Sequence, residues 1–393
     1  MNAQYLLGAL KNSFRDKRRD LLFTILVGLV TAVLLIIPNG FGSEAAGQEN
    51  AERVRGKIVS VDNSMIKITG PVKSGEQLLE VQILSGQFKG NIYESANNLV
   101  GKMEIDKFFA PGDEVLTILN LTEDKSEVVW ATVFEHYRTD KTYFLASLFF
   151  FFLIVISGWT GFKAVVSFVF SGVLIIRVLL PATLRGIDPI PASIVTLFIL
   201  TAVITLLIGG LSRKGFTAFT GAMGGVILTS ILAWFFTYWF KIHGAVRPFA
   251  ETLLYNGNPN LNLVHLFIAG VFIASSGAVM DLAMDIAAAM AEVLEKHPAI
   301  TRLALIGSGF TVARHVTGTM TTTLLLAYSA QYTAMLMAFI SMGVPFSNII
   351  NMVFVSSEVL HTLVGSFGLI LVAPLTAITG GILLIPAKKT KGL

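Results

Sequence analysis

The sequence contains no cysteine. Disulfides, thiolate nucleophiles and thiolate metal ligands are therefore excluded. Charge is also scarce, because Asp, Glu, Lys and Arg make up 14% of the 393 residues, whereas a soluble domain carries about a quarter. Hydrophobic residues reach 54%, and several stretches exceed the roughly 20 apolar residues that cross a bilayer. This composition excludes an ordinary soluble domain and predicts an α-helical polytopic membrane protein embedded in the lipid bilayer.

Motifs of familiar enzymes are missing as well. The sequence has no P-loop, HExxH or GxSxG pattern, and no serine has a recognisable base beside it. We therefore predict that the protein is not an enzyme and carries no cofactor. The net charge is only +4, and most lysines and arginines lie in tails, short loops and one soluble segment. This distribution follows the positive-inside rule and predicts no nucleic-acid partner.

Charge and hydropathy divide the chain into four regions. Residues 1–41 combine a basic cluster with the apolar run LLFTILVGLVTAVLLII, which predicts a cytoplasmic N-terminus and a first transmembrane anchor. A cleaved signal peptide is the alternative, because the small residues of SEAAG follow. Residues 141–387 are nearly all apolar and predict a multi-helix transmembrane domain, and residues 388–393 predict a basic cytoplasmic tail. We expect about ten membrane segments, with breaks near Pro345 and around Glu358–His361.

Residues 42–140 have a different pattern. The stretches VRGKIVSVD, SMIKITG, LLEVQILSG, GDEVLTILNL and EVVWATVFEHY predict about five short β-strands. The segments APGD and SGQFKG predict turns. Together they predict a small β-barrel-like domain, OB-like or SH3-like. Topology places this domain outside the cytoplasm, in a multi-pass protein of the inner (cytoplasmic) cell membrane with both termini in the cytoplasm.

Two aspartates stand where an apolar run gives way to SSGAVMDLAMDIAAAMAEVLEK. On a helix, Asp281, Asp285, Glu292 and Glu295 fall within an arc of roughly 80°. One interpretation is an amphipathic helix at the inner interface, which suits the two glutamates. Asp281 and Asp285 continue directly from the apolar run, and ionised groups at that depth are functional by default. We therefore predict that both aspartates bind a substrate or an ion.

The following segment, RLALIGSGFTVARHVTGTMTTTLLLAYSA, is charged in its middle. Arg314 lies about 12 residues past Arg302, or roughly 18 Å along a helix. Thr311, Arg314 and His315 share one face, and an arginine at that depth requires a carboxylate or a water-filled cavity. Asp281 or Asp285 is the expected partner, with Glu358 next. The alternative is an ion pair that serves only helix packing.

A third polar face occurs in SNIINMVFVSSEVLHTLVGSFG. If this segment is one helix, Asn351, Glu358 and His361 lie on one side of it. The i, i+3 spacing of Glu358 and His361 presents both side chains to one site. This spacing resembles half of the Glu-x-x-His element of carboxylate metal sites. A metal is left open, beside a proton-linked pair of Glu358 and His361.

The chain resembles the YibE/F-like family of bacterial membrane proteins. The resemblance rests on the basic N-terminus and anchor, on LSGQFKG in the β-rich segment, and above all on GAVMDLAMDI at 277–286. The family pattern has serines and an asparagine after this motif, where the chain reads AAAMAEV. This difference argues against a polar role for positions 287–291. The resemblance implies a polytopic membrane protein with a role in transport, and it supplies no substrate.

Three polar faces on three apolar segments predict a membrane transporter or permease, coupled to protons or cations. The substrate, a small solute or ion, is left open. The alternative is an envelope assembly or accessory subunit whose external β-domain docks a partner protein, and homo-oligomers fit either role. An intramembrane enzyme is least favoured, because no nucleophile arrangement is recognisable.

Overall fold

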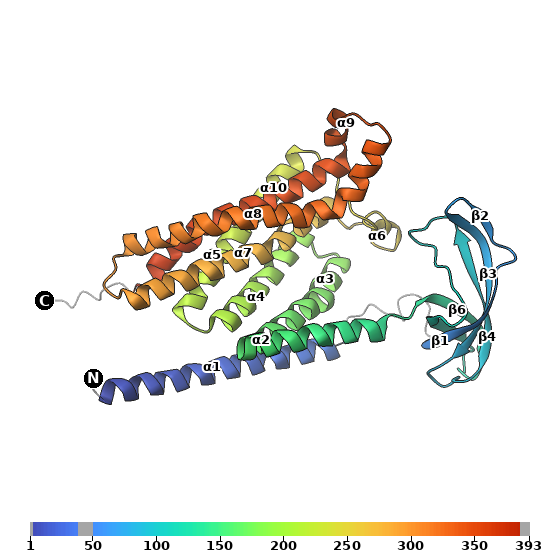
Figure 1. The fold of residues 1–393 in the computed structure, drawn as a ribbon, viewed down its shortest axis with the longest axis horizontal. Helices are drawn as coiled ribbons and strands as arrows, with labels where there is room; N and C mark the ends of the chain where they lie inside the picture. The colour runs from blue at the N-terminus through green and yellow to red at the C-terminus, as the bar shows by residue number, and fades with distance from the viewer. Residues whose placement is uncertain (1–2, 38–49, 386–393) are drawn as a thin grey trace. The chain divides into compact units, whose positions relative to one another are not determined.

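The computed structural model describes residues 3–37 and 50–385, with side chains from residue 18 onward. The chain forms two compact units (Figure 1). The β unit runs from Pro38 to Phe152, and the helical unit comprises the chain up to Ile37 and from Leu153 onward. Each unit encloses a hydrophobic core of its own.

Six antiparallel strands form a half-barrel sheet in the β unit. They are β1 (Ala51–Asp62), β2 (Lys67–Thr69), β3 (Val72–Ile83), β4 (Ile92–Val100), β5 (Glu114–Leu121) and β6 (Val128–His136). Their order is β2-β3-β1-β5-β6, and β4 also pairs with β3. The Val133 backbone N–H donates to Ser95 Oγ at 3.0 Å, which brings β6 beside β4 and curls the sheet.

Alternating side chains build the core of the β unit. In β5, burial alternates from Val115 to Leu121, because successive side chains of a strand point to opposite faces. Each of the five predicted strands overlaps an observed one. The sixth, β4, escaped prediction because only Ser95 and Leu99 of its nine residues are buried.

The helical unit consists of long helices joined by short turns. They are α1 (Ala3–Ile36), α2 (Thr139–Leu174, its first part in the β unit), a π-helical turn (Ile175–Leu179), α3 (Leu180–Leu184), α4 (Pro189–Gly209), α5 (Arg213–Trp239), α6 (Thr252–Tyr255), α7 (Leu263–Lys296), α8 (Arg302–Ser341), α9 (Phe346–Asn351) and α10 (Val353–Leu383). The Asp188 and Ser212 side chains cap α4 and α5, and those of Asn262 and Thr301 cap α7 and α8.

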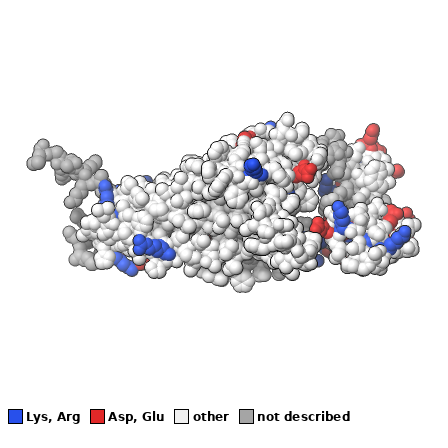
Figure 2. All heavy atoms as spheres, turned by 90° about the horizontal axis from the view of Figure 1, so that it is seen from above, with Lys and Arg blue, Asp and Glu red and all other residues white. Residues whose placement is uncertain are grey.

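Among the described residues, seven helices are long and apolar enough to cross a membrane. The visible face of the helical unit is accordingly almost free of charge (Figure 2). The chain is therefore a multi-pass membrane protein in contact with lipid, but the prediction of about ten segments is too high. Residues 139–184 form one continuous element, α2 with its continuation to Leu184, where Gly158 alone leaves the helical conformation. After Arg302 there are two long helices, because the break expected around Glu358–His361 is absent and α10 runs through both residues.

Helices α5, α7 and α10 pack closely at the centre of the helical unit. Small residues make this approach possible. A Cβ atom added at Gly221 would lie 2.2 Å from Thr376 Oγ1, and one added at Gly368 would lie 2.4 Å from Thr229 Oγ1. Close backbone approach of this kind is the main source of helix association in lipid. It fixes α10, which carries Glu358 and His361.

We expect Gly225→Ala to lower the free energy of unfolding by about 1–3 kcal/mol, since overpacking a tight contact costs this much. The added Cβ would lie 2.8 Å from both Val279 Cγ1 and Val372 Cβ. The matched control is Gly172→Ala, where nothing lies within 4 Å of the added atom. Higher helix propensity should make this control neutral or stabilising by up to about 1 kcal/mol. Thermal unfolding in detergent checks both variants, and equal effects would contradict the packing argument.

Candidate functional site

A buried cluster of ionisable side chains lies near the start of α10. Arg247 Nη1 donates to Glu358 Oε1, and Arg247 Nη2 lies 2.7 Å from His361 Nδ1. Glu358 Oε2 is 3.8 Å from the same Nδ1, and the Glu358 and His361 side chains are 9% and 6% exposed. The three residues form one hydrogen-bonded unit, called the Arg247 cluster below.

The contact with Arg247 fixes the tautomer of His361. A guanidinium group donates five hydrogen bonds and accepts none. Nδ1 of His361 must therefore accept from Arg247, so the ring is neutral and carries its proton on Nε2. Arg247 thus donates to two acceptors on α10, Glu358 Oε1 and His361 Nδ1.

Unsatisfied polar atoms surround the Arg247 cluster. Within the described part of the chain, Glu358 Oε2, His361 Nε2, Thr362 Oγ1 and Tyr328 Oη are buried and have no hydrogen-bond partner. The Tyr328 ring stacks on His361, with centroids 4.4 Å apart. Glu358, His361 and Thr362 share one face of α10 at i, i+3 and i+4. Unpaired hydrogen-bond donors and acceptors therefore occur together at this part of α10. Leaving buried polar groups without a partner costs free energy.

A cavity of about 470 Å³ opens beside the cluster. Its walls come from the segment before α6, from α7, from α8 and from α10, and include Arg247, Phe249, Gly270, Ala274, Gln331 and His361. Apart from Arg247, Gln331 and His361, the lining is mainly apolar or small. The arrangement resembles a ligand pocket, in which few polar groups stand on an apolar wall.

Local sequence explains how Arg247 reaches α10 from a loop. Gly244 has a φ of 83°, and a Cβ atom there would lie 2.2 Å from the Leu263 carbonyl carbon. Only glycine allows the loop to approach the start of α7 this closely. Phe249 also adopts a positive φ of 62°, which is costly for a bulky side chain and recurs at functional sites. This strained loop holds Arg247 over α10.

A second histidine pairs with a carboxylate in the helical unit. His265 Nδ1 lies 2.5 Å from Asp188 Oδ2, and His265 Nε2 lies 3.2 Å from Tyr238 Oη. The same Asp188 side chain caps α4 by accepting from the Ile190 backbone N–H. This chain joins α4, α5 and α7, and it was not predicted from the sequence.

The residues predicted for the site occupy three places. Glu358 and His361 lie in the Arg247 cluster. Asp281 and Asp285 are exposed on α7, and Thr311, Arg314 and His315 are exposed on α8. Asn351 lies in α9, which ends before α10 begins, and its side chain donates to the Ser347 carbonyl.

The expected partner of the acidic groups is replaced by another residue. Among the described residues, no ion pair joins Arg314 to Asp281, Asp285 or Glu358, and Arg247 takes the place beside Glu358. Sequence reasoning missed Arg247 because this residue lies outside the three polar segments that were considered for the site. The signal available was an arginine flanked by apolar residues. The described residues also contain no group of three or more His, Asp or Glu side chains placed to hold a metal ion.

A second buried ion pair was missed as well. Lys163 is 5% exposed, and its Nζ lies 3.6 Å from Asp20 Oδ2. The pair joins α1 to the apolar helix that continues from Gly158. A lysine within the run GFKAVV signals this pairing, because a buried lysine in lipid requires a carboxylate.

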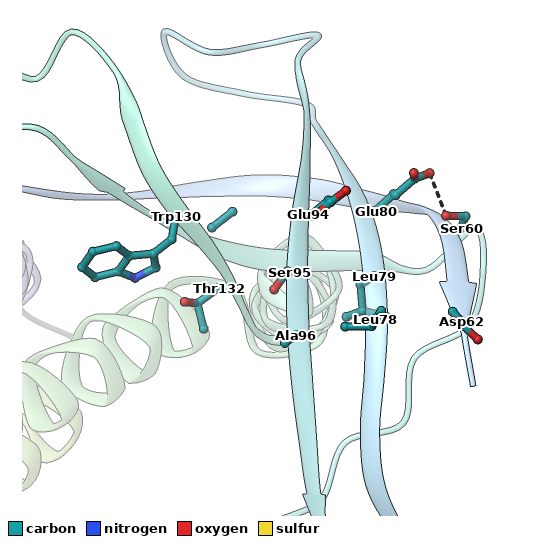
Figure 3. Close-up of a pocket in the computed structure, with 11 residues that line it drawn as sticks. Ser60, Asp62, Leu78, Leu79, Glu80, Glu94, Ser95, Ala96, Trp130 and Thr132 are labelled. Atoms are coloured by element: carbon teal, nitrogen blue, oxygen red, sulfur yellow. Dashed lines mark hydrogen bonds between the residues drawn. The ribbon is translucent and has the colours of Figure 1, made fainter. Parts of the chain in front are cut away.

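The β unit has a hollow of its own, about 560 Å³ in volume, where β4 faces β6. Figure 3 shows its lining: Ser60 and Glu80 meet through a hydrogen bond of 2.7 Å, and Ser95 and Thr132 stand on the two facing strands. Asp62 and Glu94 add carboxylates to the same surface. Trp130, which also lines this hollow, is 59% exposed.

The helices that hold these sites can be compared with known proteins. The YibE/F-like protein family matches residues 145–386, which extend from α2 to the end of α10 and contain every member of the Arg247 cluster. The chain belongs to the YibE/F-like family. This match confirms the resemblance found in the sequence. No curated protein and no solved structure matches the chain. The geometry of this YibE/F-like protein is therefore the guide to its function.

We expect Arg247→Met to destabilise the protein by about 3–5 kcal/mol, because it leaves a buried carboxylate unpaired. Combining it with Glu358→Gln should cost clearly less than the sum of the two single changes. The control is Arg177→Met, because Arg177 is half-buried and, among the described residues, donates to the carbonyls of Leu35 and Ile37 rather than to a carboxylate. Thermal unfolding of the purified protein checks the cycle, and strict additivity would contradict direct pairing of Arg247 with Glu358.

Proposed function

We propose that the protein is a membrane transporter coupled to protons, with the Arg247 cluster as its coupling site. The observation that carries the proposal is the contact of one guanidinium with both Glu358 and His361 at the wall of a cavity. Ionisable groups within membrane segments are expensive, and where they occur they mark proton relays and substrate pathways.

The cluster responds to protons in a defined way. A proton taken up by His361 would bind to Nδ1, the atom that accepts the hydrogen bond from Arg247. The hydrogen bond would be lost, and the imidazolium and guanidinium groups would repel each other. A proton taken up by Glu358 removes the negative charge that holds Arg247. Either event releases the guanidinium from α10, and with it the loop that carries Gly244 and Phe249. Proton binding would therefore move a loop that lines the cavity. An alternating-access cycle requires a movement of this kind.

The polar residues of the cavity lining limit what it accepts. They are Arg247, Gln331 and His361, and the Gln331 amide can both donate and accept hydrogen bonds. A small polar solute suits these residues better than an apolar one. The cavity volume limits the substrate class to small solutes and ions.

Contacts inside the helical unit support an orientation in the membrane. Lys163 contacts Asp20, near the start of the membrane-crossing part of α1 (Arg18–Ile36), and Arg177 donates to carbonyls at its other end, at Leu35 and Ile37. The helix after Gly158 therefore runs in the same direction as α1, so the chain between them recrosses the membrane. We therefore propose eight crossings, with both termini on one side.

Basic residues gather at the Asp20 end. Arg213 donates to the Leu384 carbonyl and Arg302 to the Ile385 carbonyl, so the α4–α5 turn, the α7–α8 turn and the end of α10 meet there. We propose that this end faces the cytoplasm of the cell and that the β unit lies outside, in accordance with the positive-inside rule.

The absence of cysteine permits a clean test of this topology. Glu123→Cys lies in the β5–β6 turn, and Ala299→Cys lies in the α7–α8 turn. A membrane-impermeant maleimide should label the first variant in cells whose inner membrane is intact, and the second only after that membrane is permeabilised. Labelling of both variants in sealed cells, or the reverse pattern, contradicts the proposed orientation.

The alternative function is an envelope assembly or accessory subunit. The hollow between β4 and β6 favours it, since an exposed Trp130 beside carboxylates offers an apolar anchor with a polar rim. In this function the β unit docks a protein, and the Arg247 cluster only holds helices together.

Proton flux in proteoliposomes distinguishes the two functions. Wild-type protein should dissipate an imposed pH gradient, reported by an entrapped pH-sensitive dye, and Glu358→Gln and His361→Asn should reduce the rate to that of empty vesicles. Glu251→Gln is the control, because Glu251 is exposed and contacts only Tyr255. The assay is run alone and with candidate small solutes on one side. Unchanged rates and pH dependence in both cluster variants would reject proton coupling and favour the docking function.

A further inference from the structure

Helix α8 is the least covered of the long helices. Only 6% of the residues in its membrane-crossing window are buried, against 56% in α7. Its exposed residues include leucines such as Leu325 and Leu326, together with a polar set made up of Thr311, Arg314, His315, Thr319, Thr322 and Thr323. Several of these hydroxyl groups donate to carbonyls of their own helix, but the Arg314 guanidinium has no ion-pair partner among the described residues.

The hydrocarbon of a bilayer is an unfavourable environment for Arg314 on this helix. An arginine near the middle of the hydrocarbon costs at least about 2.5–3.5 kcal/mol, and such residues face protein or a water-filled cavity. Arg314 lies 12 residues past the first residue of α8, about 18 Å along a helix of 40 residues. It therefore lies well inside an element that is apolar enough to cross the membrane, rather than at either helix end.

The neighbouring helix exposes the complementary charge. Asp281 and Asp285 are exposed on α7, on a ridge with Ala274, Gly277 and Ala288. A Cβ atom added at Gly277, or at Gly318 of α8, would meet nothing within 4 Å. Small residues at an open surface let a second helix approach closely. The chain therefore carries both halves of a polar helix contact on two neighbouring helices, and no ion pair joins them among the described residues.

The two halves also match in depth. Helices α7 and α8 are antiparallel and joined by a short turn, so residues equally far from that turn lie at one level. Asp285 is 11 residues from the end of α7, or about 17 Å, and Arg314 is about 18 Å from the start of α8. By the same count, Asp281 lies at about 22 Å and His315 at about 20 Å.

We propose that a second copy of the chain covers this surface, and that Asp285 of each copy pairs with Arg314 of the other. Two copies in one membrane share their orientation, so their twofold axis runs along the membrane normal and every residue keeps its depth. An isologous contact then sets α7 of one copy against α8 of its partner, twice. Matched depth is the condition for such a pair, and the chain meets it. This dimer is independent of the proposed proton coupling.

Charge reversal with mixing tests the pairing. Asp285→Arg places two arginines at each contact of a homodimer, and Arg314→Asp places two acidic groups there. Each variant alone should dimerise at least about tenfold more weakly than wild type. Mixing the two should restore dimers, because one contact is then reversed and the other native. The control pair, Glu251→Arg and Lys241→Asp, lies outside α7 and α8 and should dimerise as wild type does.

The measurement is the dimer fraction of two fluorescently tagged forms in liposomes, followed by energy transfer against dilution in lipid. Recovery confined to the mixture supports the proposal. A monomeric wild type, unaltered dimerisation of both single variants, or failure of the mixture to recover would overturn it, and would leave the polar face to water or to another membrane protein.

Cysteine cross-linking keeps the test decisive if the reversed variants fold poorly. Ala288→Cys in one tagged copy and Thr311→Cys in the other place the thiols at about 12 and 14 Å from the α7–α8 turn. A short bifunctional maleimide should join the two copies. Ile227→Cys, exposed on α5, should not cross-link with Thr311→Cys. Absence of the first product, or equal yield of the second, rejects the α7–α8 contact.

Discussion

The structure depends on one constraint: hydrocarbon does not solvate an ionised side chain. Each charge in the helical unit must therefore meet a counter-charge, reach water or lie against protein. Lys163 meets Asp20, and Arg247 meets Glu358. Both pairs join segments far apart in the sequence. Lys163 thereby ties the first helix to the bundle, and Arg247 ties a strained loop to α10.

The same constraint separates two kinds of polar residue that the sequence cannot distinguish. Glu358 and His361 are buried with Arg247, so their charges are compensated inside one chain. Asp281, Asp285 and Arg314 lie at exposed positions of adjacent helices, so compensation inside the chain is not available to them. The Arg247 cluster suits a switch, because protonation of one of its groups weakens the contact between Arg247 and α10. An exposed polar surface on membrane helices suits assembly, because contact with another protein removes it from lipid.

Much of the architecture is readable from the sequence, because long apolar runs and alternating strands are local signals. The β-rich segment, the first anchor and the long helices follow from such patterns. Prediction was weaker where the cause is tertiary. Strand β4 is mostly polar and forms because β3 offers it an edge. The excess of expected spans arose partly because α10 runs unbroken through Glu358 and His361. Arg247 could not be assigned to Glu358, 111 residues away, since nothing local records that contact.

The Arg247 cluster shows why geometry adds what residue types alone omit. A Glu-x-x-His spacing is compatible with a metal site, a structural pair or a proton relay. The guanidinium between the two side chains narrows this choice, because it accepts no hydrogen bond, so Oε1 of Glu358 and Nδ1 of His361 are both its acceptors. In the proposed function, a proton on His361 Nδ1 removes one of these acceptors, and a proton on Glu358 weakens the attraction of the other. Proton uptake would then be linked to movement of the loop through the contacts of Arg247, whatever solute occupies the cavity.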